Sequence, residues 1–285
     1  MRHSQLRAFH FVAKTGGFTR AAAAMKLTQP AVSDQVRKLE TDYDIRLFNR
    51  EKRQVSLTKS GEELLEITNH LFEVEAQAFE LLSTSRAKAT GQLRIIADSA
   101  HHISKVLARF RSTFPKVSIS MRTGNSEDVL AALRLYEADI GILGNMNPHP
   151  EFNQIKLGTS PIVAFAAVGL TSALGTKAGL QEIAKHNLIL REEGSKTRQK
   201  LEEAAAKQGI KLNATIEAEG REAVHEIVAS GAGIGFVSKA EYGQDTRVRS
   251  IQIEGPVIPM QESVACLSQR KDVRLIRAFM DIVRA

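Results

Sequence analysis

Apolar side chains in the first forty residues recur at helical spacing in three short runs. This pattern predicts helices over residues 4–15, 19–25 and 29–40, with tight connections between them. Three helices this short around one apolar core are typical of a helix-turn-helix unit. The predicted core consists of Leu6, Phe9, Phe11, Val12, Phe18, Ala21, Ala22, Leu27, Val32, Val36 and Leu39.

Residues that favour helix starts stand before two of these runs. Thr19 and Thr28 are each placed where a hydroxyl can cap the first free backbone N–H groups of the following helix. Pro30 then falls in the first turn of the third helix, where a missing N–H costs nothing. Residues 45–57 alternate loosely between apolar and polar around a basic tip, and this pattern predicts a short hairpin, or wing.

A long amphipathic stretch without proline follows over residues 60–86 and predicts one helix. Its apolar residues are spaced by alternating steps of three and four, which is the seam of a coiled coil. The helix is therefore expected to pair with a copy of itself, although packing against its own domain is the alternative. The seam residues are Leu64, Ile67, Leu71, Val74, Ala78 and Leu81.

From residue 92 the pattern changes to short β-rich runs that alternate with helices, which indicates an α/β fold with a parallel sheet. Two such arrays, with the end of the chain returning to the first, suit a ligand in the cleft between two lobes. The first array has strands at 93–97, 117–121 and 139–143 and helices at 103–114 and 126–137. The second has strands at 162–168, 188–190, 214–218 and 234–237 with helices at 197–208 and 222–229, before a final strand at 264–267 and helix at 273–283.

Charge separates the N-terminal unit from the rest of the chain. Residues 1–60 carry twelve Lys and Arg against five acidic residues, whereas the other 225 residues carry 27 of each sign. A basic unit on an otherwise neutral chain is typical of a protein with a polyanionic partner, here nucleic acid. The alternative is an ordinary solvated basic face.

Other classes of protein are disfavoured by composition. No apolar run is long enough for a membrane span, and the first residues lack the pattern of a signal peptide, so we expect a cytoplasmic protein without membrane contact. The single cysteine, Cys266, cannot form an intrachain disulfide, and no Cys/His cluster has the spacing of a zinc site.

The third helix offers a polar face for reading DNA. At about 100° per residue, Val32, Val36 and Leu39 share one arc, and the polar residues of the helix lie on another. Glutamine can bind adenine, serine can donate or accept, and arginine can bind guanine or phosphate in a major groove. The candidate DNA-binding residues are Thr28, Gln29, Pro30, Ser33, Asp34 and Arg37 on the helix, with Arg50 and Arg53 in the wing.

These motifs together resemble the N-terminal signature of the LysR-type transcriptional regulators. The resemblance rests on Phe18-Thr19-Arg20-Ala21-Ala22, Thr28-Gln29-Pro30-Ala31-Val32-Ser33, Leu39-Glu40, Leu47-Phe48, Arg50, Leu57-Thr58 and Gly61. It implies a winged helix-turn-helix over 1–58 and a dimerisation helix over 59–88. It also implies a two-lobed effector domain similar to periplasmic binding proteins, with lobe I over 92–161 and 266–285 and lobe II over 162–265.

The same resemblance implies homodimers that assemble into tetramers, double-stranded DNA and RNA polymerase as partners, and activation or repression controlled by a small co-inducer. Two positions depart from the family pattern. Asp34 stands where family members often carry a basic residue, so it would repel a phosphate and instead accept from cytosine N4. Tyr43-Asp44-Ile45 replaces the usual glycine turn, and aspartate tolerates a left-handed backbone there.

The candidate ligand residues follow predicted strands and precede predicted helices, where free N–H groups favour an anion. Plain helix capping is the alternative for each of these loops. No metal is expected at the pair His101-His102, because no carboxylate or cysteine lies near it at ligand spacing. The candidates are Ser99, His101, Asn125, Ser126, Ser195, Thr197 and Arg221.

Phrases at residues 124–133, 190–198 and 221–224 are similar to the LysR branch associated with aminoethylphosphonate catabolism, which implies a phosphonate-like ligand. An enzyme is disfavoured, because the glycine-rich run 231–236 follows a helix and Phe236 replaces its third glycine. We therefore predict no catalytic residue and no cofactor. A periplasmic-type solute-binding protein and a ligand-independent architectural DNA-binding protein are the remaining alternatives.

Overall fold

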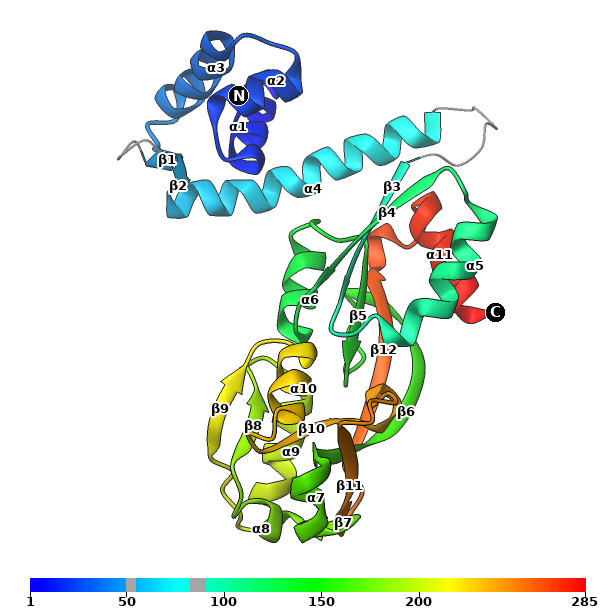
Figure 1. The fold of residues 1–285 in the computed structure, drawn as a ribbon. Helices are drawn as coiled ribbons and strands as arrows, with labels where there is room; N and C mark the ends of the chain where they lie inside the picture. Colours follow the sequence, from blue (N-terminus) through cyan, green and yellow to red (C-terminus); the bar gives the residue numbers. More distant parts are fainter. Residues whose placement is uncertain (50–54, 83–90) are drawn as a thin grey trace. The chain divides into compact units, whose positions relative to one another are not determined.

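The computed structural model describes residues 1–49, 55–82 and 91–285. The chain divides into two compact units, Met1–Arg86 and Ala87–Ala285 (Figure 1). Among the described residues, no helix has the length and apolar composition needed to cross a membrane.

Three helices form the core of the first unit: α1 (His3–Thr15), α2 (Phe18–Met25) and α3 (Gln29–Asp42). Phe9, Val12 and Val32 are fully buried between them, as the helical spacing predicts. The prediction for Leu27 is wrong: its side chain is 50% exposed, because it lies in the turn after Lys26, whose left-handed backbone ends α2.

The caps of α2 and α3 differ from each other. The Thr28 hydroxyl accepts a hydrogen bond from the Ala31 N–H, so Thr28 caps α3 as predicted. Thr19 is not a cap, because α2 already begins at Phe18, and Gly17 occupies the capping position.

The wing consists of β1 (Phe48–Asn49) and β2 (Ser56–Leu57), which pair antiparallel. Its basic tip lies outside the described residues. The Glu40 carboxylate accepts hydrogen bonds from the backbone N–H groups of Leu47 (2.9 Å) and Phe48 (3.3 Å), and so ties the first wing strand to α3. Asp44 adopts the left-handed backbone expected of it, with φ 48°.

Helix α4 (Lys59–Leu82) follows the wing directly. The Thr58 hydroxyl donates to the Arg46 carbonyl oxygen (2.7 Å) and accepts from the Gly61 N–H (3.1 Å). A Cβ atom at position 61 would collide with the Leu47 carbonyl oxygen, so glycine is required where helix and wing meet. These contacts explain why the motif contains a threonine and a glycine at these positions.

Helix α4 presents two apolar faces. Thr68 is buried on the face that packs against the helix-turn-helix, and Leu65 and Phe72 pack on the same core. Of the predicted seam, Leu64 packs on this core instead, whereas Ile67, Leu71 and Val74 lie on another face and are 64%, 38% and 47% exposed. The helix thus packs on its own domain and still leaves the seam open; the Leu81 side chain and residues 83–86 lie outside what the structure describes.

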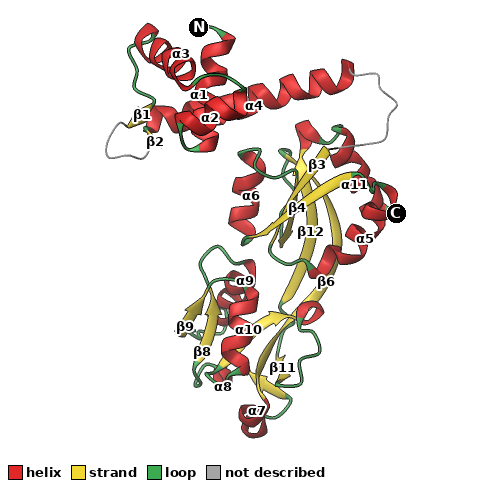
Figure 2. Cartoon of the chain, turned by 45° about the horizontal axis from the view of Figure 1, so that its top comes forward, coloured by secondary structure: helices red, strands yellow, loops and turns green. Residues whose placement is uncertain are grey.

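Lobe I of the second unit is a sheet with helices on both faces (Figure 2). The parallel strands expected from the sequence are present in the order β4-β3-β5. One face packs on Phe110 and Phe279, the other on Val129 and Leu133. The elements are β3 (Gly91–Ala97), η1 (His101–Ile103), α5 (Ser104–Thr113), β4 (Val117–Thr123), α6 (Ser126–Arg134), β5 (Ile140–Gly144), η3 (Ser268–Arg270) and α11 (Arg274–Arg284).

Two long antiparallel strands, β6 (Phe152–Ala167) and β12 (Pro259–Leu267), run from one lobe to the other (Figures 1 and 2). They join all the strands of the main path into one sheet, ordered β4-β3-β5-β12-β6-β10-β8-β9. The sequence predicts strands only at 162–168 and 264–267, but β6 begins at Phe152 and β12 at Pro259. Gly158 and Pro161 lie within β6 and do not end it.

Lobe II is built on the far end of β6. Leu201 packs on one face of its sheet and Val228 on the other, and both side chains are fully buried. Helices α7 and α8 and strands β7 and β11 were not predicted from the sequence. The elements are α7 (Val168–Leu174), β7 (Lys177–Gly179), α8 (Leu180–Ile183), β8 (Leu188–Arg191), α9 (Lys196–Ala206), β9 (Ala214–Ala218), α10 (Arg221–Ala229), β10 (Ile234–Ser238), η2 (Lys239–Glu241) and β11 (Val248–Glu254).

Candidate DNA-reading surface and effector site

The N-terminal end of α3 presents its polar residues away from the core. Val32, Val36 and Leu39 are 0%, 2% and 3% exposed, and they fix the rear of the helix against α1 and α2. Thr28, Gln29 and Pro30 are exposed, and Ser33 is half-buried beside them. The helix therefore has the apolar rear and short polar front that a major groove admits.

Asp34 is held within its own helix. Its carboxylate accepts a hydrogen bond from Arg37 (2.8 Å) and pairs with Lys38 (2.7 Å). The hydrogen bond from Lys38, followed by that from Arg37, lowers the pKa of Asp34. Because two cations surround one carboxylate, this turn of the helix stays positive overall, and the departure at Asp34 is compensated locally.

The wing contacts proposed from the sequence fall on residues that are not described. Arg50 and Arg53 both belong to the segment between β1 and β2 that the structure leaves out. A role for these two arginines in DNA binding stays a prediction.

In the second unit, a buried arginine ties lobe II to lobe I. Arg191, at the end of β8, is 8% exposed and donates to Asp98 of lobe I (3.1 Å) and to Glu192 (2.8 Å). Glu192 also accepts from the Gly220 N–H (3.0 Å). Burial raises the pKa of Asp98, and the guanidinium of Arg191 opposes that rise. Arg191 therefore offsets the negative charge of Asp98 and Glu192 at a buried contact between the two lobes.

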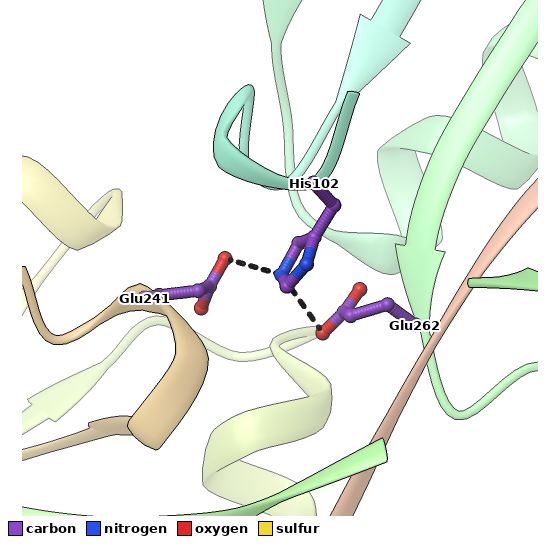
Figure 3. A group of neighbouring side chains, drawn as sticks. All are labelled: His102, Glu241 and Glu262. Carbon is purple, nitrogen blue, oxygen red and sulfur yellow. Dashed lines mark hydrogen bonds and ion pairs between the residues drawn. The ribbon is translucent and has the colours of Figure 1, made fainter. Parts of the chain in front are cut away.

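A histidine and two carboxylates form a second cluster between the lobes (Figure 3). His102 Nε2 lies 3.2 Å from a Glu241 oxygen and 3.9 Å from a Glu262 oxygen. Burial, followed by the negative charge of Glu241, raises the pKa of Glu262 to about 7. Burial would lower the pKa of His102, but the hydrogen bond to Glu241 and the two negative charges raise it overall.

The reason for expecting no metal at His101-His102 does not hold, while the expectation itself stays a prediction. The sequence shows no carboxylate at ligand spacing, yet the fold brings two distant ones to His102. Ser99 belongs to the same cluster, because its hydroxyl hydrogen-bonds the Glu241 carboxylate and accepts from the His101 N–H (3.2 Å). The His101 side chain itself is exposed, and its role in ligand binding stays a prediction.

The N-termini of α6 and α9 meet across the lobes. Asn125 caps α6 and also donates from its side chain to the Glu193 carbonyl oxygen (3.2 Å), just before α9. Ser126 and Ser195 are 0% and 2% exposed. Within the described part of the chain, neither hydroxyl has a hydrogen-bond partner. Two buried hydroxyls at facing helix N-termini can hold a polar or anionic group.

Thr197 and Arg221 line a cavity of about 300 Å³ on the lobe II side, together with Phe165 and Tyr242. Arg221 donates to the Glu241 carbonyl oxygen (3.3 Å) and to the Glu222 carboxylate (3.1 Å). The predicted ligand residues thus fall into neighbouring groups. Asn125, Ser126 and Ser195 gather at the two helix N-termini, Ser99 lies in the histidine cluster, and Thr197 and Arg221 line the cavity.

Comparison with known proteins supplies the family. Residues 3–62 match the family described as "Bacterial regulatory helix-turn-helix protein, lysR family", and residues 86–285 match "LysR substrate binding domain". The chain belongs to the LysR family.

This LysR-family protein has a curated relative in Synechocystis sp., the "HTH-type transcriptional activator CmpR". It is 28% identical over 99% of this chain and 94% of the relative. The structure of a full-length OxyR variant from Pseudomonas aeruginosa matches all of this chain and 95% of its own, with TM-score 0.79 and 19% identity. CbnR in complex with its target DNA matches with TM-score 0.70 and 18% identity, over 100% of this chain and 99% of its own.

The family match confirms the expected fold, a helix-turn-helix followed by an α/β effector domain. The LysR-family chain is a DNA-binding, ligand-responsive transcriptional regulator, and its relatives and structural neighbours are regulators rather than enzymes.

Sequence reasoning missed four functional candidates of this LysR-family protein: His102, Arg191, Glu241 and Glu262. A signal existed for Glu262, because it is an acidic residue inside an otherwise buried strand. Another existed for Arg191, a charged residue that ends the buried strand β8. For Glu241 the sequence gives no signal, since η2 is a single short turn that directly follows β10.

Proposed function

We propose that this regulator reads a specific DNA site with the front of α3 and changes that activity when a small anionic effector binds between its lobes. The polar front of α3, with Gln29 exposed and Val32 fully buried behind it, carries the first part of the proposal. DNA as the partner is supported by the CbnR complex, a protein of the same fold bound to its target DNA. Action in the cytoplasm follows from that partner.

The effector part rests on Ser126 and Ser195, the two buried hydroxyls without a partner in the described chain, at the ends of α6 and α9. Helix N-termini attract anions through their free N–H groups, and a ligand oxygen would satisfy both hydroxyls. A phosphonate offers three such oxygens. The comparisons do not support the aminoethylphosphonate branch, so the phosphonate class stands on this chemistry alone.

A homodimer in which two copies of α4 pair would explain why the predicted seam is exposed in a single chain. Ile67, Leu71 and Val74 form an apolar stripe that the described residues of the same chain leave exposed. Coiled-coil pairing would bury this stripe against a second copy. Assembly of dimers into tetramers and contact with RNA polymerase remain proposals from the family resemblance.

Substitutions on α3 test the DNA-reading face. We expect Ser33→Ala and Gln29→Ala to relax preference at individual base positions, because each removes about 1–3 kcal/mol of discrimination. Arg53→Ala should weaken binding to all sequences alike and reduce its salt dependence. Competition with sites selected from a random library, and mutated base by base, measures both effects. If Ser33→Ala leaves every base preference unchanged, the reading face has been misassigned.

Thermal shift with a panel of phosphonates, phosphate esters, sulfate and amino acids tests the effector site. An effector at a hundredfold excess over its Kd should raise stability by roughly 2.7 kcal/mol. Ser195→Ala and Ser126→Ala should abolish most of that shift, whereas Ser112→Ala should not, because Ser112 only donates to Ala108 on an exposed face. A shift that survives both site variants would show that the effector binds elsewhere.

A further inference from the structure

The histidine cluster brings three metal-ligating groups to one point from three separate elements. His102 comes from η1 of lobe I, Glu241 from η2 of lobe II, and Glu262 from the crossing strand β12 (Figure 3). Their ligand atoms all lie within 4.8 Å of one another. One ring nitrogen, His102 Nε2, faces both carboxylates.

Glu262 lacks the partners that a buried carboxylate needs. The residue is 5% exposed, and among the described residues no group donates a hydrogen bond to its carboxylate. The nearest cationic atom is His102 Nε2 at 3.9 Å, and Glu241 adds a second negative charge beside it. A buried carboxylate without donors is costly in its charged form unless it is protonated, paired or coordinated to a metal. Glu262 is therefore an independent sign that this arrangement favours a cation.

The distances are compatible with a shared metal ion as well as with the direct hydrogen bond between His102 and Glu241. Bonds of about 2.0–2.2 Å to nitrogen and oxygen in a tetrahedral ion set the ligand atoms about 3.4 Å apart. The two separations from His102 Nε2, 3.2 and 3.9 Å, lie on either side of that value. We propose that His102, Glu241 and Glu262 bind a divalent transition-metal ion between the lobes, with the remaining coordination position open to water or another ligand.

The donor set restricts the class of ion. An imidazole nitrogen suits zinc, copper, iron and nickel, whereas magnesium and calcium prefer oxygen ligands alone. The Ser99 hydroxyl, which hydrogen-bonds Glu241, supplies the outer partner that usually orients a ligating carboxylate. Zn²⁺ is therefore a suitable probe, and Mg²⁺ is the matching negative control.

A second group of possible metal ligands is unsuited to a metal ion, because a cation already pairs with its carboxylates. His225, Glu226 and Asp245 also lie close together, but Arg247 already binds both carboxylates. Its guanidinium lies 2.7 Å from an oxygen of Glu226 and 2.7 Å from an oxygen of Asp245. Among the described residues, the ion-pair partner of Glu262 is the His102 imidazole at 3.9 Å rather than a guanidinium, so the two groups are distinguishable by mutation.

Titration of the full-length, untagged protein with ZnCl₂ in a calorimeter tests the site, after treatment with a chelator and its removal. We expect binding at a single site, with affinity lowered about 100-fold or more in Glu262→Gln and in His102→Gln, since even loss of an outer partner costs about 10- to 100-fold. Glu254→Gln and His186→Gln are the matched controls, because both residues lie outside the cluster. Mg²⁺ should bind far more weakly than Zn²⁺.

The outcomes separate cleanly. Glu262→Gln is nearly isosteric, so its metal-free melting temperature checks that the fold is retained, and Glu241→Gln provides a second variant. Zinc binding that is lost with His225→Gln but kept in Glu262→Gln would overturn the proposal, as would equal affinity for Mg²⁺ and Zn²⁺. The titration does not involve DNA or effector, so its failure leaves the proposed regulatory function untouched.

Discussion

Replacing Arg191 with methionine is expected to lower the free energy of unfolding of the 87–285 unit by about 3–5 kcal/mol. Methionine keeps most of the volume but removes the charge that neutralises Asp98 and Glu192, which are 10% and 15% exposed. The two carboxylates would then carry uncompensated negative charge at the buried contact between the lobes. Denaturant-induced unfolding followed by circular dichroism measures the loss.

Two further variants show whether buried charge causes that loss. Arg122→Met removes an exposed guanidinium that pairs with Glu137 at 3.0 Å, so it should cost about 1 kcal/mol or less. Adding Asp98→Asn to Arg191→Met should restore part of the stability, because one of the stranded charges is removed. A loss from Arg191→Met no larger than that from Arg122→Met would mean that the ion pair contributes little.

Leu71→Arg is expected to convert the proposed dimer into monomers and to lower affinity for palindromic sites by roughly 10²–10⁴-fold, the gain that bivalent binding provides. Leu71 is 38% exposed within one chain and lies between Ile67 and Val74 on the open stripe. An arginine there would be an unpaired charge in the buried seam of a dimer. Light scattering reports the mass, and a binding assay with whole and half sites reports the affinity.

Glu66→Arg is the matched control for this change. It introduces the same side chain at an exposed position of α4 that is turned by about 110° from the middle of the stripe, at about 100° per residue. We expect the control to keep the mass and the palindrome affinity of the original chain. If Leu71→Arg keeps them as well, the dimer contact lies elsewhere, and α4 serves only its own domain.

The sequence is informative about the first unit because its signals are local. Helix periodicity, the Thr28 cap and the turn at Asp44 each involve residues within a few positions of one another, and the structure has all three. The motif is also explained by local contacts, since Glu40 and Thr58 hold the wing strands to their neighbouring helices. The prediction for Thr19 was wrong because a threonine one residue inside a helix gives the same sequence signal as a threonine that caps it.

The interlobe clusters were beyond sequence reasoning because their members are far apart in the chain. His102 and Glu241 are separated by 139 positions, and Asp98 and Arg191 by 93. No periodicity connects such pairs, and only the return of the chain through β12 brings Glu262 to them. The candidate serines could be predicted because strand ends and helix starts are local sequence signals. The approach of the two serines across the lobes is not local and could not be predicted.

The path of the chain also sets an order of events during synthesis. Strand β12 lies between β5 and β6 in the sheet, and α11 packs its Phe279 against Phe110 of α5. These two elements leave the ribosome after all of β7–β11. A nascent chain therefore completes most of lobe II while lobe I still lacks the strand between β5 and β6 and one of its helices. Chains that stop before residue 259 would expose the apolar side chains of lobe I that β12 and α11 otherwise cover. Chaperones and proteases recognise such surfaces.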